Sequence, residues 1–576
     1  MPTAAGFLAL LVGVLNIWRT VNPPFTRTRF AELTSVLPGV VGPLAGATSL
    51  VAGVLLIMIA HGLRRRKARA WRLIMVLLPV SALAEWVRWA HFITAALTIV
   101  IFFVLLAARK EFYALSDPRT RWRALWALLL LSMVDVAIGW GVLNAHSRAI
   151  ADEPGPGDRI EHVLLGLFGV SGPIRFTTAH AADLVYFPLA ALGALTAVTT
   201  LYLALRPERP VAELTPEQEQ AVRGLLRRHG AGDSLGYFAL RRDKSVIFSP
   251  TGKAVIAYRV VAGVMLASGD PIGDVEAWPG AIREFMTKAR RHAWVPAVIG
   301  CSETGGKVWS REAELSALEI GDEAIVEAAE FRLEGRAMRN VRQMAHRTER
   351  AGYACEIRRV GELETQERDR LRRAAQAWRD SANERGFSMA LGRIGDAADP
   401  ECMVATAHKM PDEKGIPPWG DLRAMLHFVP WGTHGLSLDL MRRDRGGDPG
   451  LNEWLIMKLL QAAPEYGVTS VSLNFAMFRA VLARGERLGA GPMLRAWRDM
   501  LIFLSRWFQI ESLYRFNAKF QPRWEPRFLI YPATRDLLRI SFAALQAEAF
   551  IPYGVFSPRT VIRSVRVAAS RRARPP

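Results

Sequence analysis

The sequence has few cysteines and lacks the common signatures of metal sites and of a nucleotide-binding phosphate loop. Its 576 residues include 3 cysteines, Cys301, Cys355 and Cys402. This number excludes a disulfide framework and favours a reducing compartment, the cytosol, for the part that carries them. No Cys/His group has the spacing of zinc ligands. The chain contains no GxxxxGK[ST] phosphate loop. We therefore expect no metal and no cofactor.

Charge and hydropathy indicate two different kinds of segment in one chain. Lys plus Arg number 74 against 54 Asp plus Glu, which gives a formal net charge of +20. Hydrophobic residues make up 51% of the chain, and the mean hydropathy is +0.12. This apolar content excludes a disordered chain. A positive mean hydropathy beside so many charges is typical of a membrane region joined to a water-soluble one.

Apolar runs crowd residues 1–210, which we interpret as a transmembrane region. A helix that crosses a membrane needs about 20 largely apolar residues. The runs are Ala4–Trp18, Val40–Gly62, Trp71–Trp86, Phe92–Ala107, Leu125–Leu143 and Ala181–Leu205. They predict about six spanning helices, although the first, third and fourth runs need flanking residues to reach that length. A signal peptide is the alternative for the first run, but Met1–Gly6 carries no Lys or Arg.

Loop charges set the predicted orientation of these helices. The segments 64–72 and 109–123 are rich in Lys and Arg, whereas the loop 144–180 mixes both signs. Short basic loops stay on the cytoplasmic side. Both termini then lie inside, which predicts a multi-pass protein of the cell membrane with its catalytic domain in the cytoplasm. Asp135 is the deepest ionisable residue of the spans and a candidate for lining a polar path.

The rest of the chain alternates between strands and helices in two similar rounds, which predicts two α/β lobes. The expected strands are 244–248, 254–261, 264–268, 295–301, 354–359, 403–407, 424–429, 436–440, 470–474 and 528–531. The expected helices are 278–292, 303–312, 334–350, 364–384, 451–466, 492–508 and 535–549. We place the first lobe at 211–334, a basic connecting helix at 335–352, the second lobe at 353–556 and a basic tail at 557–576.

Two groups of polar residues in the second lobe are candidates for substrate binding. Asp439 ends a strand, where its carboxylate could hold a substrate amine or form a structural pair with an arginine. Glu511, Arg515 and Lys519 are spaced i, i+4 and i+8, with Asn517 beside them. If this stretch is helical, one face could bind a phosphate and an amino group, or could simply be solvated.

The expected helix 334–350 carries arginines on more than one face. They are Arg336, Arg339, Arg342, Arg347 and Arg350. Affinity for nucleic acid rests on contacts between such cations and backbone phosphates. We interpret the helix as an RNA-binding element, with a solvated linker helix as the alternative.

Seven motifs spread over residues 215–550 share one resemblance. They are FALRRDKSVIFSP, ASGDPIG, EGRAMRNVRQMAHR, GFSMALGR, LSLDLMRRD, NFAMFR and ESLYRFNAKFQPRWEPRFL. Together they resemble the synthase domain of the aminoacyl-phosphatidylglycerol synthases, also called the phosphatidylglycerol lysyltransferase or multiple peptide resistance factor family. The resemblance implies a tandem GNAT-like acyltransferase domain with the aminoacyl pocket in its second lobe. The expected fold is thus an N-terminal α-helical transmembrane bundle followed by a cytosolic α/β tandem GNAT-like domain.

The resemblance also implies roles for individual residues. Catalytic roles fall on Asp439 and Arg442 of the DLMR motif and on Lys519 and Arg527 of the KFQPRWEPR stretch. The candidate substrate-binding residues are Asn474 of the NFAMFR motif and, from the spacing argument and not from the resemblance, Glu511, Arg515 and Asn517. The implied reaction is a transesterification, in which a lipid hydroxyl attacks the aminoacyl ester and the tRNA ribose hydroxyl leaves. We expect Asp439 to hold the α-amine and the three cations to bind lipid phosphate or the tRNA end. His346 and His427 are candidate general bases, but a structural role is favoured for both.

The expected partners are an aminoacyl-tRNA, phosphatidylglycerol or a related lipid, and the membrane; a homo-oligomer is left open. Lysyl and alanyl groups are the favoured donors, and the product would lower the negative surface charge that attracts antimicrobial peptides. Diacylglycerol as acceptor stays open. So do an acyl-CoA-dependent GNAT-type transferase and a non-enzymatic membrane module. With so short a membrane region we do not expect lipid flipping. Because the sequence stops at Pro576 without a fused synthetase, we expect charged tRNA to come from elsewhere.

Overall fold

The computed structural model forms two compact units, whose boundary in the chain lies between Arg209 and Pro210. It describes residues 6–11, 13–14, 55–57, 59–60, 63–64, 68–89, 92–112, 118–151, 154–170, 172–205, 212–379, 386–410, 421–477 and 510–550. The predicted span Val40–Gly62, helix 492–508 and tail 557–576 lie wholly or mostly outside the described residues.

The first unit is helical. Its described helices are α4 (Ala68–Trp89), α5 (Phe92–Ala107), α6 (Pro118–Ala145), α7 (Pro156–Leu167) and α8 (Ala179–Leu205), with the 3-10 turns η1 (Arg109–Glu111) and η2 (Ser147–Ala149). Two stretches of the described residues, Ala124–Ala145 and His180–Ala204, are long and apolar enough to cross a membrane. The predicted bundle of six spans therefore stays a prediction.

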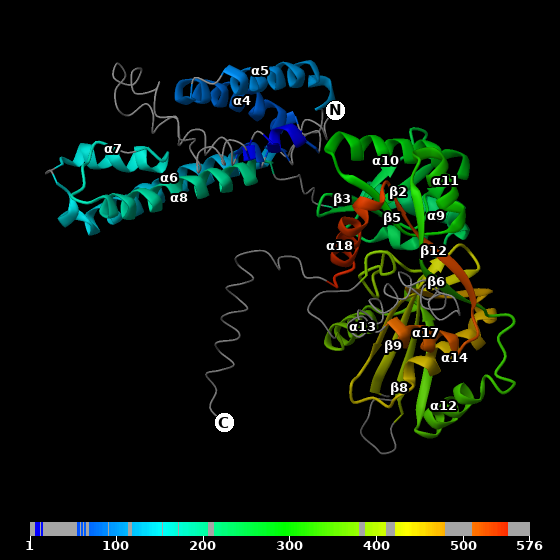
Figure 1. Ribbon diagram of the computed structural model, residues 1–576. Helices are drawn as coiled ribbons and strands as arrows, with labels where there is room; N and C mark the ends of the chain where they lie inside the picture. Colours follow the sequence, from blue (N-terminus) through cyan, green and yellow to red (C-terminus); the bar gives the residue numbers. More distant parts are fainter. Residues whose placement is uncertain are drawn as a thin grey trace, which may run out of the picture. The chain divides into compact units, whose positions relative to one another are not determined.

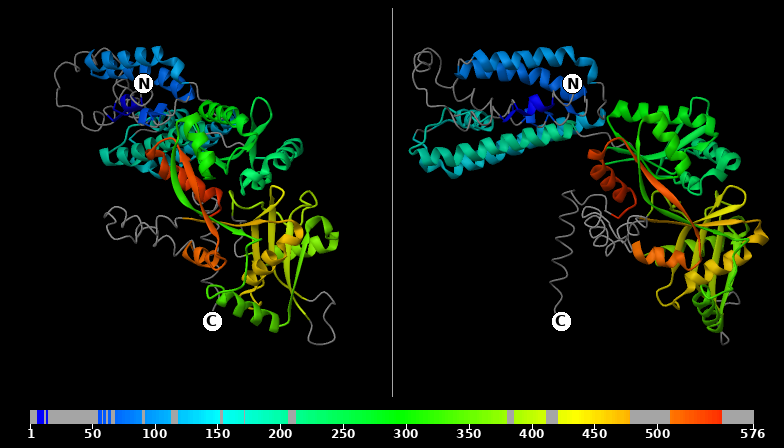
Figure 2. Two further views of the ribbon diagram at one scale, coloured as in Figure 1. Left: turned by 90° about the vertical axis from the view of Figure 1, so that its right-hand side faces the viewer. Right: turned by 45° about the vertical axis from the view of Figure 1, so that its right-hand side comes forward.

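Helices α6, α7 and α8 pack closely against one another (Figures 1 and 2). Small residues allow this approach: a Cβ added to Gly193 of α8 would lie 1.8 Å from the carbonyl oxygen of Leu167. Asp135 of α6 is 5% exposed and accepts a hydrogen bond of 2.7 Å from the Thr196 hydroxyl of α8. This contact joins the two helices, so the acid predicted to line a polar path has a structural partner.

The second unit is built on one sheet of twelve strands (Figure 1). In chain order the strands are β1 (Ser245–Phe248), β2 (Ala254–Val261), β3 (Val264–Ser268), β4 (Ile272–Gly273), β5 (Val295–Cys301), β6 (Ser316–Glu327), β7 (Tyr353–Arg359), β8 (Met403–Lys409), β9 (Asp421–Trp431), β10 (Gly435–Arg443), β11 (Ser470–Met477) and β12 (Arg523–Tyr531). Their spatial order is β1-β2-β3-β5-β12-β6-β11-β10-β9-β8-β7, and β4 pairs with β2. We call the β1–β5 side the first lobe and the β7–β11 side the second lobe.

Helices flank this sheet. They are α9 (Pro216–His229), α10 (Trp278–His292), α11 (Glu303–Ala313), α12 (Arg339–Arg350), α13 (Thr365–Ala377), α14 (Leu451–Ala462), α17 (Ile510–Ala518) and α18 (Leu537–Ala547). Their starts are set by local sequence. For example, Thr215 caps α9 by accepting a hydrogen bond from the Gln218 amide, with Pro216 at the first helical position.

Strands β6 and β12 join the two lobes. They pair antiparallel along their whole length, while β12 also pairs with β5 and β6 also pairs with β11. The C-terminal part of the chain thus returns to the first lobe, where Ile540 and Ala543 of α18 pack in the same buried cluster as Val264 and Leu266. The sequence prediction missed β6 entirely and found only the second half of β12.

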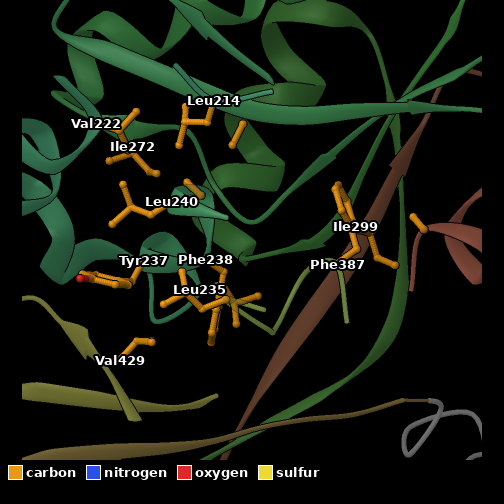
Figure 3. Packing of buried hydrophobic residues seen from close by; sticks show 14 of the residues in the cluster. Leu214, Val222, Leu235, Tyr237, Phe238, Leu240, Ile272, Ile299, Phe387 and Val429 are labelled. Carbon is orange, nitrogen blue, oxygen red and sulfur yellow. The ribbon is translucent and has the colours of Figure 1, made fainter. Parts of the chain in front are cut away.

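The same cluster continues from the first lobe into the second. Figure 3 shows Leu235 and Tyr237, which precede β1, near Val429 of β9. Phe387, from the segment before β8, is fully buried in this cluster. The opposite face of the second lobe is covered by α12 and α14 around the buried Trp454. The two lobes therefore share one buried apolar cluster.

The arginine-rich helix is shorter than predicted. Helix α12 begins at Arg339, whereas residues 335–338 form turns and Gly335 has φ = +82°. The guanidinium of Arg342 donates to the carbonyl oxygens of Leu333 and Gly335. These bonds hold the chain in a turn before the helix starts, which explains why the helical pattern of charges overestimates its length.

Candidate functional site

The second lobe contains a pair of parallel strands that separates. Strands β10 and β11 pair only at Gly435–Ser437 and Ser470–Ser472, although both strands continue well beyond these positions. The side-chain amide of Asn474 donates to the carbonyl oxygen of Leu438 just past the last pair. Beyond this contact β10 stays with β9 and β11 stays with β6. We call this opening the splay.

The corresponding pair in the first lobe stays closed. There β3 and β5 pair over Val264–Ser268 and Val295–Ile299, and the Gly269 amide donates to the Ile299 oxygen at 3.0 Å. Gly269 has φ = +69° and turns the chain away at this point. The two lobes therefore differ, and among the described strands it is the second lobe that opens its parallel pair.

Asp439 lies at the vertex of the splay, on a bulge between Leu438 and Leu440. Its Oδ1 accepts the Leu391 amide at 2.6 Å, and its Oδ2 lies 2.6 Å from Nδ1 of His427 on β9. The side chains of His427 and Asp439 are 1% and 2% exposed. A carboxylate only accepts hydrogen bonds, so Nδ1 carries the proton and Nε2 of a neutral ring is left as an acceptor. That Nε2 is buried and has no hydrogen-bond partner among the described residues.

Two asparagines expected to bind substrate lie at the β11 side of the splay. Asn474 has φ = +67°, and its backbone amide donates to the Ser472 hydroxyl at 3.2 Å. Asn517 of α17 is 1% exposed, and its amide group donates to the Leu473 oxygen at 3.3 Å. In the described structure the side-chain oxygens of both asparagines are buried and lack a donor. Asn474 thus bonds to the residue before Asp439, and Asn517 bonds to the residue before Asn474, while their role in substrate binding stays a prediction.

Arg527 does not face the solvent, which differs from the expected contact with a phosphate. It is 3% exposed and donates to Glu323 of β6 at 2.9 Å, to Asp233 at 2.8 Å and to the Ser234 hydroxyl at 2.7 Å. Burial by itself lowers the pKa of the guanidinium, but the carboxylates of Glu323 and Asp233 outweigh it and raise that pKa. Arg527 is therefore a buried ionic anchor between β12, β6 and the first lobe.

This anchor is connected to the splay by hydroxyl groups. Glu323 accepts hydrogen bonds from Ser234 at 2.5 Å and from Ser472, the last residue of β11 that pairs with β10. Ser437, the last residue of β10 that pairs with β11, donates to the Ser234 oxygen at 2.7 Å. A continuous polar network thus fixes both strands where they begin to separate.

Asp270 forms a second buried acid beside this network. It accepts hydrogen bonds from the Ser302 amide at 2.8 Å, the Ser302 hydroxyl at 2.5 Å and the Cys301 thiol at 3.2 Å. Burial, reinforced by the neighbouring Asp233, raises the pKa of Asp270 to about 6. The described residues contain no group of His, Cys, Asp and Glu arranged to hold a metal ion.

The remaining candidates are spread over the surface of the second lobe. Lys519 follows the end of α17, is 43% exposed and pairs with Glu453 of α14 at 2.8 Å. The predicted i, i+4, i+8 face therefore stops after Arg515, which is exposed; the side chain of Glu511 lies outside the described part. Arg442 continues β10 four positions past Leu438 and donates to the Met441 oxygen at 3.3 Å.

The arginines of the 336–350 segment are mostly exposed. Arg336, Arg339, Arg347 and Arg350 are exposed and Arg342 is half-buried. Arg347 donates to the Pro449 oxygen at 2.7 Å and Arg350 to the His346 oxygen at 3.3 Å. The segment presents a basic surface of its own, and the structure does not bring it together with Asp439.

Sequence reasoning missed Glu323 and the partnership of His427 with Asp439. Both residues sit on strands whose neighbours in space come from distant parts of the chain, so no local spacing could reveal them. The one available signal was the unusual presence of a His and an Asp in otherwise apolar strands, at LHFVP and LSLDL.

Comparison with known proteins gives two family models that together span most of the chain. Residues 223–531 match the model "Phosphatidylglycerol lysyltransferase, C-terminal", and residues 1–203 match "Transmembrane region of lysyl-tRNA synthetase". The lysylphosphatidylglycerol biosynthesis bifunctional protein LysX of Rhodococcus opacus is 41% identical over 520 residues, covering 88% of this chain and 45% of that protein. The protein of the same name from Mycolicibacterium gilvum is 38% identical over 563 residues, covering 96% and 50%. The chain thus spans about half the length of the curated relatives it matches.

Two solved structures also match, at lower identity. L-PGS from Bacillus licheniformis is 22% identical, covers 59% of this chain and 99% of its own, and has a TM-score of 0.48. The C-terminal domain of a putative lysylphosphatidylglycerol synthetase from Agrobacterium fabrum is 25% identical, covers 57% and 96%, and has a TM-score of 0.47. The family match over more than half of the chain, which contains the whole splay, settles the assignment: the chain belongs to the phosphatidylglycerol lysyltransferase family.

Proposed function

We propose that the chain is an aminoacyltransferase that moves a lysyl group from lysyl-tRNA to phosphatidylglycerol. The observation that carries this proposal is the family match over residues 223–531. The lysyl donor is supported by the name of the relatives, lysylphosphatidylglycerol biosynthesis protein, and by the N-terminal match to a region of lysyl-tRNA synthetase. The product would make the membrane surface less negative and so weaken the attraction of cationic peptides.

The splay supports this reaction as the place where the aminoacyl ester would lie. The side-chain oxygens of Asn474 and Asn517 are buried acceptors without donors in the described structure. Unpaired buried acceptors favour a ligand rich in N–H groups, such as a lysyl group, because each pair formed removes a desolvation penalty. In this proposal Arg442, Lys519, Glu511 and Arg515 contact the phosphate and amino groups of the substrates, while Arg527 positions the strands.

We further propose the predicted membrane organisation. About six helices of residues 1–210 would form a bundle, with lobes at 211–334 and 353–556, a basic segment at 335–352 and a basic tail at 557–576 in the cytoplasm. The charge difference between the segments 64–72 and 144–180 supports this orientation. A fluorescent protein fused after Pro576 should fluoresce, whereas alkaline phosphatase at the same place should be inactive. The opposite pair of results would reverse the topology.

The function is tested with membranes from cells that make the full chain. Radiolabelled lysyl-tRNA and phosphatidylglycerol vesicles are added, and the extracted lipids are analysed by mass spectrometry. We expect lysyl-phosphatidylglycerol, and we expect its loss when the tRNA is first digested with ribonuclease. Parallel reactions with alanyl-tRNA and with diacylglycerol test the other donor and acceptor. If no lipid acquires an amino acid, the proposal is wrong.

Two arginines, one in the turn before α12 and one at its first position, give a prediction about tRNA binding. Arg336 and Arg339 are exposed, and reversing both charges to glutamate should raise KM for lysyl-tRNA with little change in kcat. The slope of log KM against log salt should fall by roughly one for each tRNA phosphate that the variant no longer neutralises. The matched control reverses the exposed Arg227 and Arg228 at the end of α9. Equal effects of the two double variants would show that net charge, and not a binding surface, is responsible.

A further inference from the structure

The pair of His427 and Asp439 has the geometry of a general base and the group that orients it. The Nδ1–Oδ2 distance is 2.6 Å, and both side chains are almost completely buried. The second carboxylate oxygen is held by the Leu391 amide at 2.6 Å. The carboxylate is therefore fixed from two sides, and the imidazole ring is fixed by the carboxylate. Such an arrangement sets which ring nitrogen carries the proton.

The free nitrogen of His427 is the unusual feature of the pair. Its Nε2 is buried without a hydrogen-bond partner in the described structure. In the sheet His427 lies opposite Leu440 of β10 and Val404 of β8, and both of these side chains belong to or pack against the apolar core. An unpaired acceptor in such surroundings costs about 1–3 kcal/mol. Buried polar atoms are otherwise paired, so an orphan beside a splay favours a role in binding or chemistry.

The same geometry argues against Asp439 as the ligand of the α-amine. Both of its oxygens already have partners, and its side chain is 2% exposed. Each oxygen can accept a second hydrogen bond, but a substrate ammonium would have to be desolvated in the protein interior to donate it. The atom of the pair that lacks a hydrogen-bond partner in the described structure is Nε2 of His427, which is buried as well.

We propose that His427 is the general base of the transfer reaction and that Asp439 is its positioning residue. This inference rests on the proposed function. The lipid hydroxyl gives its proton to Nε2 as its oxygen forms the new bond to the ester carbonyl carbon. The imidazolium, stabilised by Asp439, then returns the proton to the ribose oxygen as that oxygen's bond to the carbonyl carbon breaks. The proton and the ester bond are conserved, so no co-reactant is needed.

The primary test is His427→Gln in the full chain, assayed with lysyl-tRNA and phosphatidylglycerol vesicles. Glutamine can still bond to Asp439 but cannot take up a proton. We expect kcat to fall about 10²- to 10⁴-fold, the usual contribution of a general base, with KM for lysyl-tRNA unchanged. His408→Gln is the matched control. His408 lies on the neighbouring strand β8, is also mostly buried and bonds to Thr406, and its replacement should leave kcat near the wild-type value.

Asp439→Asn tests whether the carboxylate orients His427 or binds the α-amine of the substrate. The Leu391 amide requires an oxygen acceptor, so the new NH2 group would face Nδ1 of His427. The ring proton then moves to Nε2, which can no longer accept one. We expect a loss of kcat similar to that of His427→Gln, and the double variant should be no worse than either single one, because residues that act as a unit are not additive.

Three results would overturn the inference. They are full activity of His427→Gln, multiplicative losses in the double variant, and an Asp439→Asn variant that raises KM for lysyl-tRNA while keeping kcat. If the His427→Gln variant does not accumulate in membranes, the Asp439→Asn variant tests the inference, because a change in kcat supports it and a change in KM alone contradicts it. The wild-type chain in the same assay tests the proposed function separately. If the wild type makes no lysyl lipid, the proposed function is wrong. If the wild type and His427→Gln are equally active, only the proposal that His427 is the general base is wrong.

Discussion

Replacing Arg527 by methionine is expected to lower the free energy of unfolding by about 3–5 kcal/mol, the usual cost of removing one partner from a buried ion pair. The guanidinium is the cation that faces Glu323 and Asp233 in the interior, at 2.9 and 2.8 Å. Without it these two carboxylates keep their desolvation penalty but lose their counter-charge. Methionine fills a similar volume, so the destabilisation reports on charge and not on a cavity.

Arg523 provides a matched control on the same strand. It is 56% exposed and pairs with Glu327 and Glu525. Because exposed ion pairs contribute about 0–1 kcal/mol, Arg523→Met should leave stability nearly unchanged. Both variants are compared with the wild type by urea unfolding of the full chain in detergent, followed by tryptophan fluorescence. Equal midpoints for Arg523→Met and Arg527→Met would show that the buried network does not stabilise the fold.

The effect of Arg527→Met should also depend on pH. Arg527 lowers the pKa of Asp270, which burial and Asp233 raise to about 6. Without the arginine, the folded chain would hold the Asp270 proton to a still higher pH, whereas the unfolded chain loses it near pH 4. A folded pKa above the unfolded one means that stability is lost as pH rises between the two values. The variant should therefore be more destabilised at pH 8 than at pH 5.

The buried network also explains which part of the fold the sequence could not predict. Strand β6 contains Glu319, Asp322, Glu323 and Glu327 in twelve residues, a pattern that does not indicate a central strand. It becomes possible because β12, about 200 residues later, supplies Arg527 to Glu323 and Arg523 to Glu327. Periodicity detects local burial, but it cannot detect a charge that is neutralised by a distant strand.

Some residues of the candidate site could likewise be predicted from the sequence, and others could not. Asp439, Asn474 and Asn517 stood in recognisable motifs, and the structure places them around the splay. Their partners were not predictable. Leu391 contributes only a backbone amide, and His427 lies in a run of apolar residues that reads as an ordinary strand. Nor could spacing show that Arg527 is buried while Lys519 is exposed, because both appear in one short motif rich in cations and aromatic residues.

The first lobe holds a buried lysine that should make stability depend on pH between 7 and 9. Lys244 has no exposed surface, donates to the Phe238 oxygen at 3.0 Å and to the Ser268 hydroxyl at 2.7 Å, and lies 4.6 Å from the centre of the Phe387 ring. Burial, together with the nearby Arg241, lowers its pKa to about 7. The lysine therefore enters the folded interior most readily in its neutral form.

The sign of the pH dependence follows from the two pKa values. In the folded chain the lysine loses its proton at about pH 7, whereas the unfolded chain keeps it to pH 10.5. Between these values unfolding takes up a proton, so a rise in pH favours the folded state. Each pH unit contributes up to about 1.4 kcal/mol, and from pH 7 to 9 we expect a gain of about 2 kcal/mol in the free energy of unfolding.

Lys244→Met removes the titrating group and should abolish this gain, while Lys307→Met, at a residue that is 75% exposed, should keep it. Urea unfolding of the full chain at pH 7, 8 and 9 measures both. The difference between wild type and Lys244→Met matters here, because other groups that titrate in this range contribute equally to both proteins. A parallel pair of pH curves would mean that Lys244 stays charged in the interior. In that case the carboxylates of Asp243 and Glu548, which raise its pKa, would outweigh burial, and Lys244 would join Arg527 as a second buried cation held by acids.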